Sequence, residues 1–319
     1  MIYFRCEYET IGDGIMKLGF VSAILPDKTF EEVIDFAALT GYRSVEVMCW
    51  PTGKAERRYA GVTHIDLDQL SEAQAKKIID YTAGKGIEIS ALSYYPNPMD
   101  SDLEKRSTVI AHLKKIIKNA GKLNIDTVNT FIGRDPKKSL SASMADFKTI
   151  WPDIIKVAED NNVRIAIENC PMLFTEDEWP GGKNLGTTPA IWTDMFSIIP
   201  SKNFGLNYDP SHFIWQQVDY IQPVYDFKEK IFHAHIKDIK IDKDKLNRVG
   251  IMAVPLDYCS PKLPGYGDVD WAKYIAALKE VKYDGHVAIE VEDKDFENSL
   301  EDRMNALVVS KKYIDQFLV

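Results

Sequence analysis

Eight times along this chain a short, largely apolar run is followed by a longer amphipathic segment. The runs have the length of strands, and their apolar character is typical of parallel strands with both faces buried. The predicted strands cover residues 16–23, 43–50, 87–93, 127–131, 163–169, 204–208, 231–236 and 286–292. The predicted helices cover residues 29–41, 70–83, 103–120, 143–161, 189–199, 216–230, 271–281 and 299–317.

Local end signals support this assignment. Thr29 can cap the first helix, Glu32 follows three residues later as in a capping box, and Gly41 can end the helix. Eight such units without a break in composition predict a single (β/α)8 TIM barrel domain over 1–319. Residues 1–15 are expected to form an irregular leader, and 239–268 a long loop. A doubly wound open sheet is the main alternative, but no GxGxxG follows the first predicted strand.

Composition limits the classes of partner and the compartment. The net charge of −9 argues against a nucleic-acid partner, which requires clustered Lys and Arg. The chain has no run of 18 apolar residues and no basic start with a long apolar run, so we expect neither a membrane span nor a secretory signal. Its four cysteines are widely spaced. They predict no disulfide framework, and a reducing cytoplasm fits this pattern.

Four consecutive predicted strands end in residues that can bind a metal. These are Glu168 in IAIEN, Asp209 in NYDPSH, His235 in HAHIKD and Glu290 in VAIEVE. In a barrel the carboxyl ends of the strands converge on one face, and carboxylates buried there need a partner. Three carboxylates and one imidazole favour a single divalent ion, with Mn²⁺ first, Mg²⁺ or Co²⁺ next, and Zn²⁺ less favoured. Alternatively, the two glutamates pair with Lys or Arg across the barrel.

The chain resembles the xylose-isomerase-like TIM barrels, also described as sugar phosphate isomerases/epimerases. That group includes ketose 3-epimerases, inosose dehydratases and, more distantly, endonuclease IV. The resemblance rests on IAIEN, LNYDPSH, HAHIKD, PGYGDVDW and IEVE, and it runs over nearly the whole chain from Met16. It implies that Glu168, Asp209, His235 and Glu290 are the metal ligands. It also implies that His212 lies at the substrate or the metal.

Further residues are expected around a sugar. Trp50 and His64 belong to a polar loop after the second predicted strand, Lys237 follows His235 at the strand end, and Tyr94 follows the third strand. We expect all four to contact substrate. His233 is expected to face away from His235 and to be structural.

These residues suggest a metal-dependent sugar isomerase or epimerase. One of the catalytic glutamates, Glu168 or Glu290, would remove the proton α to the carbonyl of a ketose or keto-glycoside, giving a metal-stabilised enediolate. The other glutamate would return a proton to the opposite face. A lyase or dehydratase that eliminates a β-substituent would use the same site. The expected partner is a small sugar. The sequence does not decide whether this sugar is phosphorylated or whether the protein forms a homo-oligomer.

Two other classes of function compete with this interpretation. DNA repair at abasic sites would need more histidines on the early strands, whereas the chain offers only His64 and His112 before the fifth predicted strand, and His112 lies inside a predicted helix. A barrel that binds sugar without catalysis is the second alternative. The complete ligand set argues against it.

Overall fold

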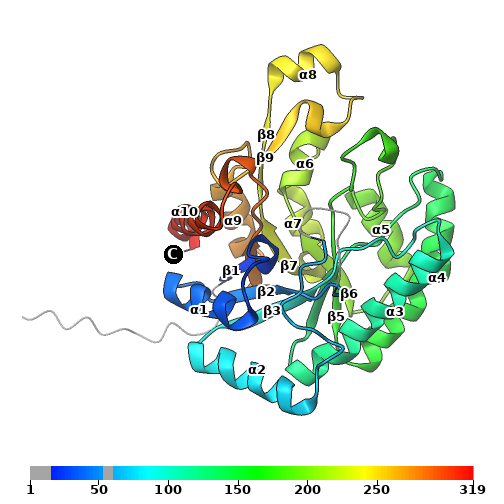
Figure 1. The fold of residues 1–319 in the computed structure, drawn as a ribbon. Coiled ribbons are helices and arrows are strands. Elements are labelled where there is room, and N and C mark those ends of the chain that lie inside the picture. The colour runs from blue at the N-terminus through cyan, green and yellow to red at the C-terminus, as the bar shows by residue number, and fades with distance from the viewer. Residues whose placement is uncertain (1–15, 53–59, 319) are drawn as a thin grey trace, which may run out of the picture.

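Eight parallel strands close into one barrel in the computed structural model, which describes residues 16–52 and 60–318 (Figure 1). The closed order is β1-β10-β7-β6-β5-β4-β3-β2. The predicted (β/α)8 barrel is therefore confirmed, and the open sheet is excluded. The leader expected at 1–15 lies outside the described residues. The barrel strands are β1 (Lys17–Val21), β2 (Ser44–Met48), β3 (Glu88–Ser93), β4 (Thr127–Thr130), β5 (Arg164–Glu168), β6 (Phe204–Tyr208), β7 (Ile231–Ile236) and β10 (His286–Ile289).

Helices surround the barrel, and Figure 1 shows them on its outer side. The first begins at a complete capping box between Thr29 and Glu32 and ends at Gly41, which has a φ of 77°. This confirms the end signals read from the sequence, since glycine adopts positive φ at low cost. The longer helices are α1 (Phe30–Thr40), α2 (Glu72–Lys85), α3 (Leu103–Ala120), α4 (Leu140–Asp160), α5 (Pro189–Ile198), α9 (Trp271–Glu280) and α10 (Leu300–Leu318).

The single helix predicted for 216–230 is wrong. The chain instead forms two short helices, α6 (Ser211–Gln216) and α7 (Gln222–Asp226). Gln217 takes a left-handed conformation with a φ of 56° and ends the first helix. Pro223 lies in the first turn of the second, where its missing N–H costs nothing.

The long loop predicted for 239–268 is also wrong, because this segment carries its own structure. Strands β8 (Asp238–Ile241) and β9 (Cys259–Lys262) pair antiparallel, and α8 (Lys243–Val249) lies between them. We call residues 238–268 the β8–β9 lobe, and it projects beyond the barrel mouth in Figure 1.

The buried Asp238 carboxylate anchors this lobe. It accepts hydrogen bonds at 2.9–3.0 Å from the backbone N–H groups of Ile239, Gly265 and Val269 and from the indole N–H of Trp271. Four donors on one carboxylate fix the start of the lobe against its end.

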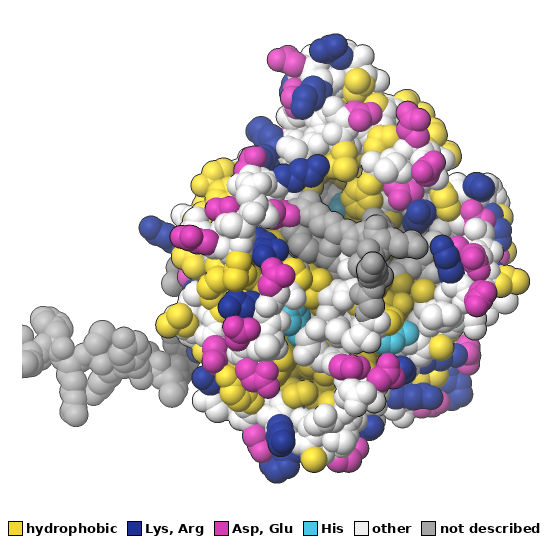
Figure 2. Space-filling model, viewed as in Figure 1, with side chains coloured by type: hydrophobic (Ala, Val, Ile, Leu, Met, Phe, Trp, Pro, Cys, Tyr) yellow, Lys and Arg dark blue, Asp and Glu magenta, His cyan; other side chains and the backbone are white. Residues whose placement is uncertain are grey.

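The layer between the barrel strands and the surrounding helices is apolar, whereas the molecular surface carries charges of both signs. One continuous core of buried side chains joins the strands to the surrounding helices. Basic and acidic side chains are interspersed on the face shown in Figure 2. Within 16–52 and 60–318, none of the helices has the length and apolar character that a membrane span needs.

Candidate metal centre and substrate cavity

The four predicted metal-binding residues meet at the carboxyl ends of four neighbouring strands. Glu168 ends β5, Asp209 follows β6 directly, His235 lies in β7, and Glu290 follows β10 directly. One ligand-type atom from each residue lies within 4.8 Å of those of the other three. The strand order therefore brings together residues that are up to 122 positions apart in the chain (290 − 168).

Two of these residues have a ligand-type atom that is buried without a hydrogen bond. Asp209 Oδ2 and His235 Nδ1 have no hydrogen-bond partner, although both lie near charged groups. Asp209 Oδ2 is 3.1 Å from Lys237 Nζ, and His235 Nδ1 is 3.4 Å from Glu290 Oε2. Buried polar atoms without partners are costly unless a cation or another ligand satisfies them. Three carboxylates and one imidazole fit a divalent cation such as Mn²⁺, Mg²⁺, Co²⁺ or Zn²⁺.

A buried carboxylate that the sequence analysis missed orients the histidine. His235 Nε2 lies 2.8 Å from Glu46 Oε2, and Glu46 is fully buried in β2. A carboxylate at that distance requires the proton on Nε2, so Nδ1 is the nitrogen left to bind a metal. Tyr95 donates to the other oxygen of Glu46 at 2.6 Å.

The pKa of Glu46 reflects this pairing. Burial acts to raise it, but the nearby His235 ring outweighs burial and holds the pKa well below its usual value. A glutamate inside the apolar run SVEVM was the sequence signal that could have identified it.

His233 does not point away from His235, so this expectation was wrong. Residues two apart in a strand share a face, and both rings point into the barrel. His233 Nδ1 donates to Asn207 Oδ1 at 3.0 Å, and its Nε2 accepts from Ser90 Oγ at 3.1 Å. Burial lowers its pKa to about 3. The neutral ring therefore belongs to a buried hydrogen-bond network below the metal centre.

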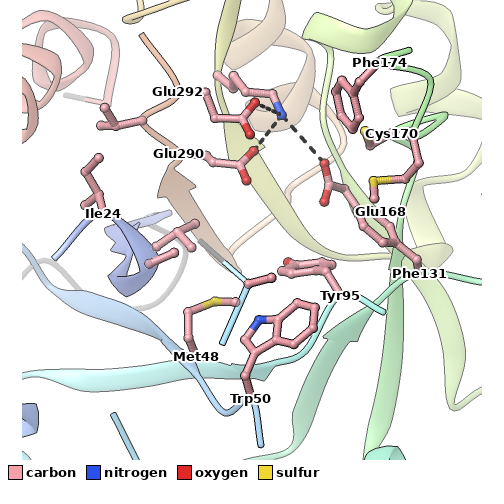
Figure 3. Close-up of a pocket in the computed structure, with 16 residues that line it drawn as sticks. Ile24, Met48, Trp50, Tyr95, Phe131, Glu168, Cys170, Phe174, Glu290 and Glu292 are labelled. Atoms are coloured by element: carbon pink, nitrogen blue, oxygen red, sulfur yellow. Dashed lines mark hydrogen bonds and ion pairs between the residues drawn. The ribbon is translucent and has the colours of Figure 1, made fainter. Parts of the chain in front are cut away.

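Lys237 places an ammonium group among the carboxylates. Its Nζ lies 2.7 Å from Glu290 Oε2 and 3.3 Å from Glu292 Oε2, and it also contacts Asp209 and Glu168. The dashed lines in Figure 3 mark the ion pairs of Glu168, Glu290 and Glu292. Burial acts to lower the pKa of Lys237, but these carboxylates raise it well above its usual value. Glu292 was missed in the sequence, although it stands two residues after Glu290 and so on the same face.

His212 also reaches the centre. Its Nε2 lies 3.3 Å from Glu168 Oε1 and 3.2 Å from Asp209 Oδ2. Cys170 is close enough to form a second buried cluster with Glu168 and His212. The position of His212 at the start of α6 follows from the DPSH turn after β6.

The two glutamates differ in their protonation behaviour. Burial and the neighbouring charge of Glu290 raise the pKa of Glu168. Burial also acts to raise the pKa of Glu290, but Lys237 and His235 outweigh it and lower the pKa to about 2. Unequal environments of this kind separate two carboxyl groups into a stronger and a weaker base.

A cavity of about 110 Å³ opens over Glu168 and Glu290 of the candidate metal site. Its floor carries the charged side chains, and its walls are largely aromatic and aliphatic (Figure 3). The floor includes Glu168, Glu290, Lys237 and Glu292, and the wall residues include Ile24, Met48, Trp50, Tyr95, Phe131, Met172 and Phe174.

Only some of the residues predicted to contact substrate line this cavity. Trp50 and Lys237 line the cavity. Tyr94 does not: it is buried behind Trp50, with ring centroids 4.8 Å apart, and its neighbour Tyr95 faces the cavity instead. Alternation of side chains past the end of β3 explains the exchange.

His64 is likewise held away from the cavity lining. Its Nε2 donates to the Leu25 backbone carbonyl at 3.1 Å. Burial lowers the pKa of this ring. His64 thus joins two loops, and its contact with substrate stays a prediction.

Comparison with known proteins agrees with the fold. A model of the xylose isomerase-like TIM barrel family matches residues 34–310. Inosose dehydratase of Clostridium tetani (strain Massachusetts / E88) is 32% identical over 316 residues, covering 95% of this chain and 96% of that protein. A crystal structure of D-psicose 3-epimerase from Clostridium cellulolyticum H10 has a TM-score of 0.67 at 15% identity, covering 95% of this chain and 99% of that one.

The IOLI protein with a bound zinc atom has a TM-score of 0.70 at 18% identity, covering 95% of this chain and 99% of that one. At these identities the two structures support the fold alone. Because the family model spans most of the chain, the chain belongs to the xylose isomerase-like TIM barrel family.

Proposed function

We propose that this protein is a divalent-metal-dependent sugar epimerase or isomerase that acts on a ketose or keto-glycoside. The observation that carries the proposal is the placement of two glutamates at the floor of one cavity: Glu168, buried at the end of β5, and Glu290, partly buried directly after β10. A proton can then be removed on one side of a substrate carbon and returned on the other.

The metal would be held by Glu168, Asp209, His235 and Glu290. A divalent cation bound there supplies Lewis-acid polarisation of the substrate carbonyl, which acidifies the adjacent C–H. Glu46 fixes the tautomer of His235 through its hydrogen bond at 2.8 Å. The zinc atom named with the IOLI structure supports a metal in this arrangement of strands.

The chain's own residues perform the proton transfer. Glu168, whose pKa is raised by burial and by Glu290, is the stronger base and removes the proton α to the carbonyl. Glu290 would stand on the other side of the substrate carbon. Since its low pKa leaves it ionised, it would pass on a proton taken up from water, while Glu168 releases its own proton to water. His212, whose Nε2 lies beside Glu168, and Lys237 at the floor would donate to substrate oxygens.

The cavity walls suit a sugar ring. Aromatic faces such as those of Trp50 and Tyr95 pack against the C–H groups of a pyranose, while the polar floor binds its oxygens. A ketose and a glycoside that carries a ketone both present such a face. We propose a small sugar of this kind as the partner of the protein.

A dehydratase is the second candidate, and the 32% identity to inosose dehydratase of Clostridium tetani favours it. Elimination would begin with the same proton removal by Glu168. It would then need an acid for the departing hydroxyl group, and the Lys237 ammonium at the cavity floor can supply that proton.

Proton exchange in D₂O tests the proposal and separates the two outcomes. The protein is loaded with Mn²⁺ or Zn²⁺ and incubated with ketoses, inososes and 3-keto-glycosides, which are followed by NMR. Deuterium next to the carbonyl with an inverted centre supports the epimerase. Loss of water supports the dehydratase. Glu168→Gln serves as the inactive control. If the metal-loaded protein exchanges no more deuterium into any of these substrates than this variant does, proton abstraction at this site is refuted.

A further inference from the structure

Lys237 contacts the same carboxylates that would bind the metal. Its Nζ is 2.7 Å from Glu290 Oε2 and 3.1 Å from Asp209 Oδ2, and both residues belong to the four-residue cluster. The side chain is buried, with 5% exposure, so water does not screen these contacts. An ammonium group and a divalent cation therefore compete for the same carboxylates.

A fourth acidic residue, Glu292, offers Lys237 another position. Glu292 Oε2 lies 3.3 Å from Nζ but is not part of the metal cluster. Its side chain is 27% exposed and lines the cavity beside Lys237. Among the described residues, Lys237 is the only Lys, Arg or His that forms an ion pair with Glu292.

Four carboxylates surround one ammonium group, and the His212 and His235 rings are the other groups beside them that can carry positive charge. Glu168, Asp209, Glu290 and Glu292 all lie within 3.9 Å of Nζ, so the ammonium group alone leaves an excess of negative charge that these rings share in balancing. A divalent cation would reduce that excess, while Lys237 still balances Glu292. Both cations can therefore be accommodated if the ammonium group moves from the ligand oxygens to Glu292.

We propose that Lys237 is a tethered cation that competes with the metal and is transferred to Glu292 when the metal binds. This inference rests on the proposed function, because it requires a divalent cation at the four-residue cluster. Glu292 acts as a positioning residue for Lys237 and not as a ligand. With the metal in place, the ammonium group stays at the cavity floor, where it donates to a substrate oxygen.

The test is a double-mutant cycle on metal affinity, measured by competition with a chromogenic chelator for Mn²⁺ and Zn²⁺. Lys237→Met should tighten metal binding by about tenfold or more, because a nearby like charge is removed. Glu292→Gln should weaken binding. Lys262→Met is the matched control: Lys262 pairs with Asp293 and Asp295 away from the cluster, and the change in net charge is the same.

The cycle separates movement from simple electrostatics. Fixed charges act additively on metal affinity, whereas a lysine that moves makes the two substitutions depend on each other. We expect the effect of Glu292→Gln to shrink by at least about threefold in the Lys237→Met background. Equal effects in both backgrounds, or weaker binding by Lys237→Met, would overturn the inference while leaving the proposed function standing.

A second neutral variant and the metal binding of the unaltered protein complete the design. Lys237→Gln serves as a second neutral variant if Lys237→Met does not fold, as judged by circular dichroism. Absence of divalent-metal binding by the unaltered protein would refute the proposed function and this inference together.

Discussion

Glu46→Gln is expected to weaken divalent-metal binding about tenfold while the barrel stays folded. Glu46 Oε2 accepts a hydrogen bond from His235 Nε2 at 2.8 Å in a fully buried position. Hydrogen bonds to charged groups contribute about 1.5–3 kcal/mol, against about 0.5–1.5 kcal/mol for neutral ones. Glutamine keeps the shape and the acceptor but loses the charge. The difference of roughly 1–1.5 kcal/mol corresponds to about tenfold in Kd, within the range seen for such outer partners of metal ligands.

The loss of Glu46 has a second effect of opposite sign. Its carboxylate helps to raise the pKa of His235, so a proton competes with the metal for the ring. The variant lowers that pKa and weakens the competition. The deficit in affinity should therefore be smaller at the lower of two pH values than at the higher one, where proton competition is weaker.

Chelator competition at both pH values measures these effects. Tyr95→Phe is the matched control, because it removes the 2.6 Å hydrogen bond to Glu46 Oε1 but keeps the carboxylate. We expect it to change Kd by less than about threefold. An unchanged Kd for Glu46→Gln at the higher pH, with a native circular dichroism spectrum, would refute the role of Glu46.

Three other results are expected. Burial acts to lower the His235 pKa, but the neighbouring carboxylates hold it well above its usual value, so metal affinity should rise with pH through neutrality. Calorimetry in two buffers will detect the released proton, and a pH-independent Kd would contradict this. Glu168→Gln and Asp209→Asn should each abolish tight binding of the divalent metal. If elemental analysis finds one metal ion per protein in both variants, the ligand assignment is refuted. Asp238→Ala leaves four donors without an acceptor and should lower the free energy of unfolding by at least about 3 kcal/mol. Urea unfolding measures this, and a change below about 1 kcal/mol would refute the anchoring role.

The barrel and the convergence of the four ligand-type residues could be predicted from the sequence. The reason is physical: in a parallel barrel every strand ends on the same face, so residues such as Glu168 and Glu290 meet whatever their separation in the chain. The helix that Thr29 begins could also be predicted, because its capping box depends only on residues close together in the sequence.

The missed features depend on contacts between distant segments. Glu46 pairs with His235, which is 189 positions away, and the run SVEVM alone does not show which residue meets that glutamate. Tyr94 and Tyr95 exchange roles because their orientation depends on where β3 ends. Two short helices replace the one long helix after β6 because Gln217 adopts a positive φ. Glutamine rarely adopts this conformation, so the sequence does not predict it.

The β8–β9 lobe leaves and rejoins the barrel at nearly the same point. The N–H of Asp268 donates to the carbonyl of Ile239 at 2.8 Å, so the two ends of the segment are joined to each other. Within the lobe, Pro255, Leu256 and Cys259 line a second cavity that also contacts Lys237 and Glu292. Because its two ends meet, the segment could be replaced as a unit. Such a replacement would reshape the cavity beside Lys237 and Glu292, while Glu168, Asp209, His235 and Glu290 would keep their places on the barrel strands.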